Sequence, residues 1–254
     1  MNAADIASRL TKARIEARTV QIENLNGLIA NVDDAYRVQA ELATLAGGGV
    51  RGWKVTALTP QDQGKYFAAS PVAGPLFAPY VDASPAKFTL SRFVAPVFEC
   101  EIAFVLGADL PSRSAPYDRR EVEAAVEAVV AAIEIPDSRV EAGATALVTL
   151  ADAMGNGAFI VGAPVSRWRE LDLTNIAITM TADNGEHLVG NSNRILGNPF
   201  LAVLALANAH PLGAGGLKKG QIVTTGTCTT PVPCRAGTYV AEFGPLGTVC
   251  VRFE

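Results

Sequence analysis

The segment Val97-Phe98-Glu99-Cys100-Glu101-Ile102-Ala103-Phe104-Val105-Leu106 decides the fold and the chemistry that this chain supports. Side chains of a β-strand alternate between its two faces, so Glu99 and Glu101 point to the same side. The apolar side chains of the other face would pack into a core; they are Phe98, Cys100, Ile102, Phe104 and Leu106. We therefore expect a strand that presents two neighbouring carboxylates from one face.

Two carboxylates at this spacing repel each other unless a cation joins them. A hard divalent ion with oxygen ligands, Mg²⁺ or Mn²⁺, would satisfy the pair and leave coordination positions open for a chelating substrate. In the alternative interpretation, one or both acids point into solvent from an edge strand.

The composition is that of a soluble enzyme with one large core and room for a small appended lobe. The chain has 254 residues, of which 49% are hydrophobic and 18% charged, and its formal net charge is -4. Its basic residues are scattered, which argues against a nucleic-acid partner. The N-terminus lacks an apolar leader and no apolar run is long enough to span a membrane, so we expect no membrane partner and a cytoplasmic location.

Cysteine and histidine give little support to other kinds of site. Cys100, Cys228, Cys234 and Cys250 include no Cys-x-x-Cys pair, so we expect reduced thiols and no zinc site. The chain has two histidines, which argues against a histidine-based triad.

Periodicity predicts an α+β chain with a soft boundary near residue 60, which separates an N-terminal helical lobe (1–60) from a β-rich catalytic domain (61–254). Turn markers punctuate the second part and break it into short pieces. The expected helices are 2–17, 33–46, 118–133 and 198–210. The expected strands are 51–56, 97–106, 133–135, 158–161, 176–180, 221–225, 239–243 and 248–253.

A third acid extends the carboxylate pair. Glu134 lies between Ile133 and Ile135, where the expected helix gives way to a strand, and Arg139 follows after a turn. Glu134 either joins Glu99 and Glu101 at a metal ion or forms an ion pair with Arg139.

These segments, taken in order, resemble the fumarylacetoacetate hydrolase superfamily, and most of all its 2-keto-4-pentenoate hydratase and 4-oxalocrotonate decarboxylase branch. The likeness runs from about residue 50 to the C-terminus. It rests on the segments Glu99-Cys100-Glu101-Ile102-Ala103-Phe104, Ile133-Glu134-Ile135-Pro136-Asp137-Ser138-Arg139, Thr225-Gly226-Thr227 through Pro231-Val232-Pro233, Gly52-Trp53-Lys54-Val55, Leu196-Gly197-Asn198-Pro199 and Leu246-Gly247-Thr248-Val249.

The resemblance implies a β-roll catalytic domain that holds Mg²⁺ or Mn²⁺ through Glu99, Glu101 and Glu134. It places Lys54 beside the substrate, where its ammonium group would hold a carboxylate or deliver a proton, and it places Thr227 at the substrate as well. The alternative for Lys54 is an exposed lysine at a strand end. The resemblance also implies a homo-oligomer.

The implied substrate is a short 2-oxo or dienoic acid. A hydratase would add water to 2-hydroxypenta-2,4-dienoate and give 4-hydroxy-2-oxopentanoate through a metal-chelated enolate. The same ligands would also serve a 4-oxalocrotonate-type decarboxylase or a diketo-acid hydrolase, so the ligand set does not choose among the three reactions. Phe67, Phe77 and Tyr80 indicate a partly apolar pocket wall, and we expect Phe77 to contact substrate.

The chain departs from the family pattern at two places. Ala78 follows Gly74-Pro75-Leu76-Phe77 where family hydratases commonly have an acidic pair, and Asp82 is the candidate substitute for the missing proton-transfer acid. Asp152 matches the family acid of Asp-Asn-Ala-Ser and is a catalytic candidate, but Ala153 and Gly155 replace the Asn and Ser, and Asn156 restores a donor only with a one-residue shift. These losses keep a rival hypothesis open: a non-catalytic subunit that binds a related hydratase or decarboxylase.

Overall fold

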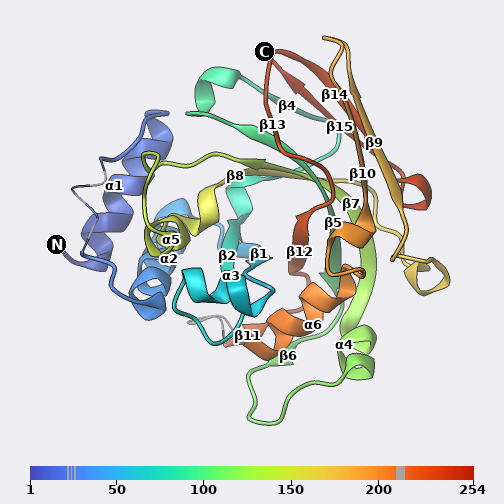
Figure 1. Ribbon diagram of the computed structural model, residues 1–254, viewed down its shortest axis with the longest axis horizontal. Coiled ribbons are helices and arrows are strands. Elements are labelled where there is room, and N and C mark those ends of the chain that lie inside the picture. Colours follow the sequence, from blue (N-terminus) through green and yellow to red (C-terminus); the bar gives the residue numbers. More distant parts are fainter. Residues whose placement is uncertain (22, 24, 26, 210–214) are drawn as a thin grey trace.

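The fold is a mixed α/β arrangement with several sheets, seen in a computed structural model that describes residues 1–21, 23, 25, 27–209 and 215–254. Helices α1, α2 and α5 lie on one side of the molecule, and β9, β10 and β14 lie on the other (Figure 1). The α-helices are α1 (Ala3–Ile15), α2 (Val32–Ala46), α3 (Pro60–Lys65), α4 (Arg119–Ala125), α5 (Ala146–Ala151) and α6 (Phe200–Ala209).

The largest sheet has eight strands in the order β2-β1-β12-β5-β7-β8-β3, with β13 paired to β5. In this sheet β5 runs antiparallel to both β12 and β7, while β1 runs parallel to β12. The strands are β1 (Val50–Thr56), β2 (Val72–Phe77), β3 (Val81–Ala83), β5 (Val97–Leu106), β7 (Val126–Pro136), β8 (Asn156–Val161), β12 (Ile222–Thr227) and β13 (Val232–Pro233).

A second sheet has five strands in the order β10-β9-β14-β15-β4, and β6 (Leu110–Pro111) pairs with β11 (Gly216–Leu217). The five strands are β4 (Ala86–Phe88), β9 (Ala177–Ala182), β10 (His187–Asn191), β14 (Gly237–Glu242) and β15 (Thr248–Phe253). The strand expected at 97–106 is confirmed at its stated bounds, and the other expected strands match to within two residues, apart from the region after residue 125 described below.

The main hydrophobic core contains the apolar face of β5. Its five expected residues, Phe98, Cys100, Ile102, Phe104 and Leu106, are all 0% exposed and pack with residues of β7, β9, β14, β15 and α6. The opposite face of the large sheet buries a small cluster that includes Ala103, Val130 and Phe159. Because Ala103 follows Glu101 by two positions, the glutamates share this second face with that cluster.

A separate cluster joins the N-terminal helices to α5 and the edge of β2. Asn2 caps α1 and Asn31 caps α2, each accepting a hydrogen bond from a backbone N–H of the first turn. Two buried side chains of α2 reach edge strand β2: the Tyr36 hydroxyl accepts from the Ala73 N–H, and Gln39 Nε2 donates to the Ala73 carbonyl. Helix α2 thereby satisfies backbone groups that β2 would otherwise bury without partners.

The helix expected at 118–133 is wrong in its second half. Helix α4 ends at Ala125, and Val126 begins the long strand β7, which places Glu134 within a strand and not at a helix-to-strand transition. Every residue of β7 from Ala128 to Ile135 is buried. Its apolar residues therefore do not alternate with polar ones, and the sequence pattern resembles that of a buried helix. Pairing with β5 and the β-branched residues Val126, Val129 and Val130 favour the strand.

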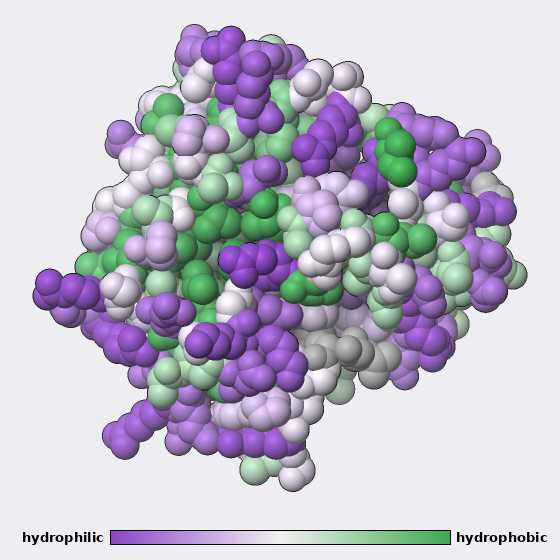
Figure 2. Space-filling view, turned by 180° about the vertical axis from the view of Figure 1, so that it is seen from behind, coloured by the Kyte–Doolittle hydropathy of each residue, from purple (hydrophilic) through white to green (hydrophobic). Residues whose placement is uncertain are grey.

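Helix α6 begins at Phe200, two residues after the expected start, and the Asn198 side chain accepts from the Phe200 N–H at 3.0 Å. The predicted end at His210 lies outside the described residues. All four cysteines are free thiols. None of the helices in the described ranges combines the length and apolarity needed to cross a bilayer. Seen from behind, hydrophobic residues form patches between hydrophilic ones (Figure 2).

Candidate active site

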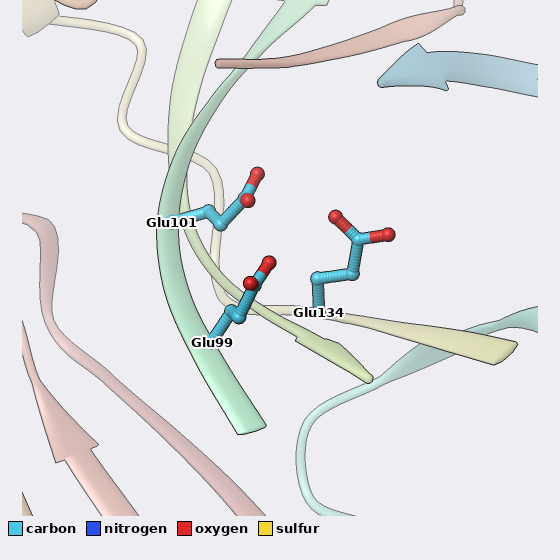
Figure 3. A group of neighbouring side chains, drawn as sticks. All are labelled: Glu99, Glu101 and Glu134. Atoms are coloured by element: carbon cyan, nitrogen blue, oxygen red, sulfur yellow. The ribbon is translucent and has the colours of Figure 1, made fainter. Parts of the chain in front are cut away.

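Three glutamates meet on one face of the large sheet. Glu99 pairs with Glu134 across β5 and β7, and Glu101 is the next residue of β5 on that face. Their side chains extend toward a common space, with ligand oxygens within 4.8 Å of one another (Figure 3). Glu101 is 2% exposed and Glu134 1%, whereas Glu99 is partly exposed. The expected convergence of the two acids of β5 is present, and strand pairing adds the third.

Burial and mutual repulsion disfavour negative charge at this cluster. Burial, followed by the charge of Glu134, raises the pKa of Glu99 to about 7. The same two causes raise the pKa of the fully enclosed Glu101 well above its ordinary value. For both groups, burial and mutual repulsion outweigh the opposing effect of the nearby Lys54 charge.

Lys54 is the source of this opposing charge. Its ammonium group donates to the Glu134 carboxylate and, at 3.1 Å, to the Met154 carbonyl, and its side chain is 12% exposed. Burial lowers the pKa of Lys54, but the carboxylates of Glu134 and Glu99 outweigh burial, so the net pKa is raised. Lys54 is therefore a protonated, largely buried group at the site and not an exposed lysine at a strand end.

Glu101 is oriented by β12. The Thr224 hydroxyl donates to Glu101 Oε2, and the Gly226 N–H donates to the same oxygen at 3.3 Å. Both donors use Oε2, so Oε1 remains available to a cation. Thr224 lies on this face because it pairs with Lys54 on one side and Ala103 on the other.

A hard divalent cation fits this donor set. All ligand atoms are carboxylate oxygens, they lie within reach of one ion, and three acids face the single ammonium of Lys54 among the ion pairs of the described residues. Oxygen ligands of this kind suit Mg²⁺, Mn²⁺ or Ca²⁺. The alternative in which Glu134 pairs with Arg139 does not hold, because Arg139 pairs with Asp152 at 2.9 Å.

Two further predicted residues lie around the cluster. Thr227 pairs with Glu101 in the register of β12 and β5, and its hydroxyl donates to the Thr229 carbonyl at 3.1 Å. Asp152 is 1% exposed and its carboxylate accepts from the side chain and the backbone N–H of Arg139, both at 2.9 Å. Asp152 thus binds Arg139. In the described part of the chain, the hydrogen bonds of its carboxylate go to Arg139 and not to the glutamate cluster.

Asp82 and Phe77 are not brought to the cluster. Across β7, β8 and β3, Glu134 pairs with Phe159 and Phe159 pairs with Val81, so the next residue, Asp82, faces the opposite side of the sheet. Phe77 is 2% exposed, packs in the cluster of the N-terminal helices and meets Tyr80 edge to face. Of the other expected wall residues, Phe67 is 84% exposed.

Curated relatives match almost the whole chain. It is 30% identical to a 2-keto-4-pentenoate hydratase of Burkholderia vietnamiensis, over 98% of this chain and 97% of that protein. The chain belongs to the 2-keto-4-pentenoate hydratase family. A second relative of this family, the 2-oxo-hept-4-ene-1,7-dioate hydratase of Escherichia coli, is 28% identical over 98% of this chain and 96% of its own. A scan against protein-family profiles found no match.

Solved structures share the fold of this hydratase-family chain. The 4-oxalocrotonate decarboxylase of Pseudomonas putida G7, complexed with magnesium and adipate, has a TM-score of 0.86 and 24% identity and covers 99% of this chain and 97% of its own. The fumarylpyruvate hydrolase of Pseudomonas aeruginosa, in complex with Mn²⁺ and pyruvate, has a TM-score of 0.55 and 15% identity, over 81% of this chain and 90% of its own. The resemblance to the fumarylacetoacetate hydrolase superfamily is confirmed at the level of fold.

Sequence reasoning missed three parts of the candidate site: the Thr224 hydroxyl, the Met154 carbonyl and the interaction between Arg139 and Asp152. Thr224 left a signal, since it has the same strand parity as the apolar Ile222 and therefore places a hydroxyl on the same face of the expected strand. The Met154 carbonyl left no signal in the sequence, because every residue has a backbone carbonyl and the residue type does not show which one is used.

Proposed function

We propose that this protein is a divalent-metal-dependent hydro-lyase that adds water to 2-hydroxypenta-2,4-dienoate or a related short 2-oxo or dienoic acid. The observation that supports the proposal most is the cluster of Glu99, Glu101 and Glu134 with Lys54 beside it. Full-length similarity to curated hydratases supports the reaction class. Mg²⁺ or Mn²⁺ is the proposed cofactor, in keeping with the ions bound by the solved relatives.

A divalent ion held by the three glutamates would supply Lewis-acid polarisation of the substrate's 2-oxygen. The protein's own groups then have distinct tasks. Thr224 and the Gly226 N–H hold Glu101, and the ammonium of Lys54 lies where it attracts the substrate carboxylate or gives a proton. We assign Thr227, the last residue of β12 and the partner of Glu101 in the strand register, to the substrate side.

The proposed reaction balances in two steps. Ketonisation moves the enol proton of 2-hydroxypenta-2,4-dienoate to the terminal carbon, and water then adds across the remaining conjugated double bond, with its hydroxyl on the fourth carbon and its proton on the third. The product is 4-hydroxy-2-oxopentanoate. The sheet places no second acid beside the cluster at Asp82, so Lys54 is the proposed proton-transfer group.

The test is the loss of ultraviolet absorbance of freshly made 2-hydroxypenta-2,4-dienoate, with and without Mn²⁺. Turnover should require the metal and fall below detection in Glu101→Gln. Glu127→Gln, which changes an exposed glutamate of β7, should leave turnover unchanged and serves as the matched control. Full turnover by Glu101→Gln would refute the proposal.

A decarboxylase of the 4-oxalocrotonate type is the second candidate. A 4-oxalocrotonate decarboxylase of a Pseudomonas species is 34% identical over 64% of this chain and 62% of its own. Ala78 occupies the position where the family pattern gives hydratases an acid, which favours the reaction that needs no water activation. Release of CO₂ from 4-oxalocrotonate, without decay of the dienoate, would select this candidate over the hydratase.

Further parts of the proposal concern architecture and assembly. We infer that the curved large sheet corresponds to the β-roll of the superfamily and that a helical lobe precedes it up to about residue 60. We also infer a cytoplasmic location and a homo-oligomeric assembly. A mixed complex with a related decarboxylase is the alternative assembly. Exposed apolar side chains are compatible with assembly; they include Ile15, Phe67 and Val189. Light scattering after size-exclusion chromatography measures the subunit number, and a monomeric mass would refute the proposed homo-oligomer.

A further inference from the structure

The segment that presents the Met154 carbonyl to Lys54 has an unusual backbone. Ala153, Met154 and Gly155 have φ values of 52°, 56° and 67°, in the left-handed region that residues with a Cβ rarely adopt. A Cβ makes this conformation sterically costly at Ala153 and Met154, so the surrounding structure must hold the turn in place.

One side chain ties both ends of the turn. Arg139, which is 2% exposed, donates through Nη2 to the Asp152 carbonyl at 2.9 Å and through Nη1 to the Asn156 carbonyl at 2.8 Å. Its Nε and its backbone N–H both donate to the Asp152 carboxylate. The residues immediately before and after the turn are therefore fixed to the same guanidinium group.

The turn is seated on Gly74 of β2, the residue that pairs with Lys54 in the register of β1 and β2. A Cβ on Gly74 would lie 2.7 Å from the Ala153 oxygen and 2.8 Å from the Ala153 carbonyl carbon, closer than real atoms approach. Only a glycine therefore lets the turn lie against the sheet beside Lys54. The Met154 carbonyl, one peptide further along, accepts from Lys54 Nζ at 3.1 Å.

We propose that the Ala153–Gly155 turn is the positioning device for Lys54, held by Arg139 and Asp152 and seated on Gly74. Among the described residues, Lys54 donates to two acceptors, the Glu134 carboxylate and this carbonyl. The carboxylate also belongs to the metal cluster, whereas the carbonyl does not. The carbonyl thus fixes the ammonium group independently of the metal ligands. Arg139, Asp152 and Gly74 are positioning residues that act through Lys54.

The turn coincides with one of the chain's departures from the family pattern. Where that pattern has Asn and Ser, this chain has Ala153 and Gly155, and the hydrogen bond from Lys54 to this segment is accepted by the Met154 backbone oxygen. The role of Lys54 in turnover rests on the proposed function; the seating of Lys54 by the turn does not.

The first experiment compares Gly74→Ala with Gly64→Ala, since a Cβ added at Gly64 would meet no other atom within 4 Å. Gly74→Ala should lower kcat about 10- to 100-fold, the cost of a displacement of about 1 Å at a catalytic group. Gly74→Ala should still bind Mn²⁺ in calorimetry, because the three glutamates are untouched, and Gly64→Ala should match the wild type in both kcat and Mn²⁺ affinity. Unchanged kcat in a folded Gly74→Ala protein would overturn the claim that the turn acts on turnover through Lys54, and the labelling experiment below decides the seating itself.

A second measurement does not depend on turnover. Limited acetylation with acetic anhydride, followed by mass spectrometry, gives the labelled fraction of Lys54 relative to Lys87, whose side chain is 63% exposed. Labelling of Lys54 should rise severalfold in Gly74→Ala and in the near-isosteric Asp152→Asn, which also covers the case in which Gly74→Ala does not fold. Gly64→Ala should leave labelling unchanged.

The two readouts separate the two hypotheses. Wild-type protein that turns over no dienoate or 4-oxalocrotonate, while labelling rises in both variants, would remove the proposed function and keep the seating of Lys54. Equal labelling in the wild type and in the folded variants would overturn the seating, whatever the activity.

Discussion

At the scale of single residues, the site depends on how each carboxylate is oriented. Glu101 is the clearest case, because its Oε2 accepts from Thr224 and Gly226 while Oε1 remains available to a cation. Groups that orient a metal ligand in this way contribute strongly to metal affinity, although they do not touch the ion.

Replacing Thr224 with valine removes the hydroxyl and keeps the shape of the side chain. We expect Thr224→Val to weaken Mn²⁺ binding by about 10- to 100-fold, because Glu101 loses its nearest donor. Thr224→Ser keeps the hydroxyl and is the matched control. Isothermal titration calorimetry measures both, and equal affinities of Thr224→Val and the wild type would contradict the assigned role.

The raised pKa of Glu99 predicts how the metal-free protein responds to pH. Burial and Glu134 raise this pKa from 4.5 to about 7, so the folded state binds more protons than the unfolded chain between these values. The free energy of unfolding should therefore fall as the pH rises from about 4.5 to about 7. Urea unfolding with a chelator present measures the trend.

Two controls identify the source of this pH dependence. Glu99→Gln should flatten the trend, because glutamine does not titrate. Mn²⁺ at about 100 times its Kd should restore about 2.7 kcal/mol at neutral pH by binding only the folded state. A trend of equal slope in Glu99→Gln would assign the pH dependence to other groups.

At the scale of secondary-structure elements, strand pairing assembles the site. The antiparallel pairing of β5 and β7 places Glu99 opposite Glu134, and the parallel pairing of β1 and β12 places Lys54 beside Thr224. The local sequence pattern correctly predicted strand β5 but extended helix α4 too far. Strand β7 is buried on both faces, so its sequence lacks the alternation of apolar and polar residues that identifies a strand.

Gly52 lies where β1 and β12 approach each other closely. A Cβ there would lie 2.2 Å from the Ile222 carbonyl oxygen, so Gly52→Ala must push the two strands apart. We expect a loss of about 1–3 kcal/mol in the free energy of unfolding and a lower kcat, since Lys54 lies two residues along β1. Urea unfolding and steady-state kinetics measure these effects, with Gly64→Ala again as the control; wild-type stability would contradict the close approach.

At the scale of the whole molecule, the N-terminal helices pack against the elements that carry the site, strand β2 and helix α5. Gln39 of α2 is 4% exposed and donates to the Ala73 carbonyl of β2 at 3.1 Å and to the Leu150 carbonyl of α5 at 2.6 Å. Strand β2 carries Gly74, and α5 leads into Asp152. One buried amide therefore connects both supports of the Ala153–Gly155 turn.

Gln39→Leu leaves two buried carbonyls without this donor. We expect it to cost about 1–3 kcal/mol of the free energy of unfolding, the penalty for buried polar groups that lose their partners. The same change at the exposed Gln61 should cost much less. Urea unfolding of both variants tests the difference, and equal stabilities would argue that Gln39 does not connect these elements.

The sequence by itself determined what local geometry fixes: the β5 strand, its apolar face, and the placement of Glu99 and Glu101 on one side. Alternation along a strand is a property of neighbouring residues, and so it could be read without the fold. Tertiary structure decided the rest. Which strand pairs with β5, and in which register, brings Glu134, Lys54 and Thr224 to the carboxylates and turns Asp82 to the other face. These residues lie far apart in the chain, and only the packing of the sheet determines which of them meet.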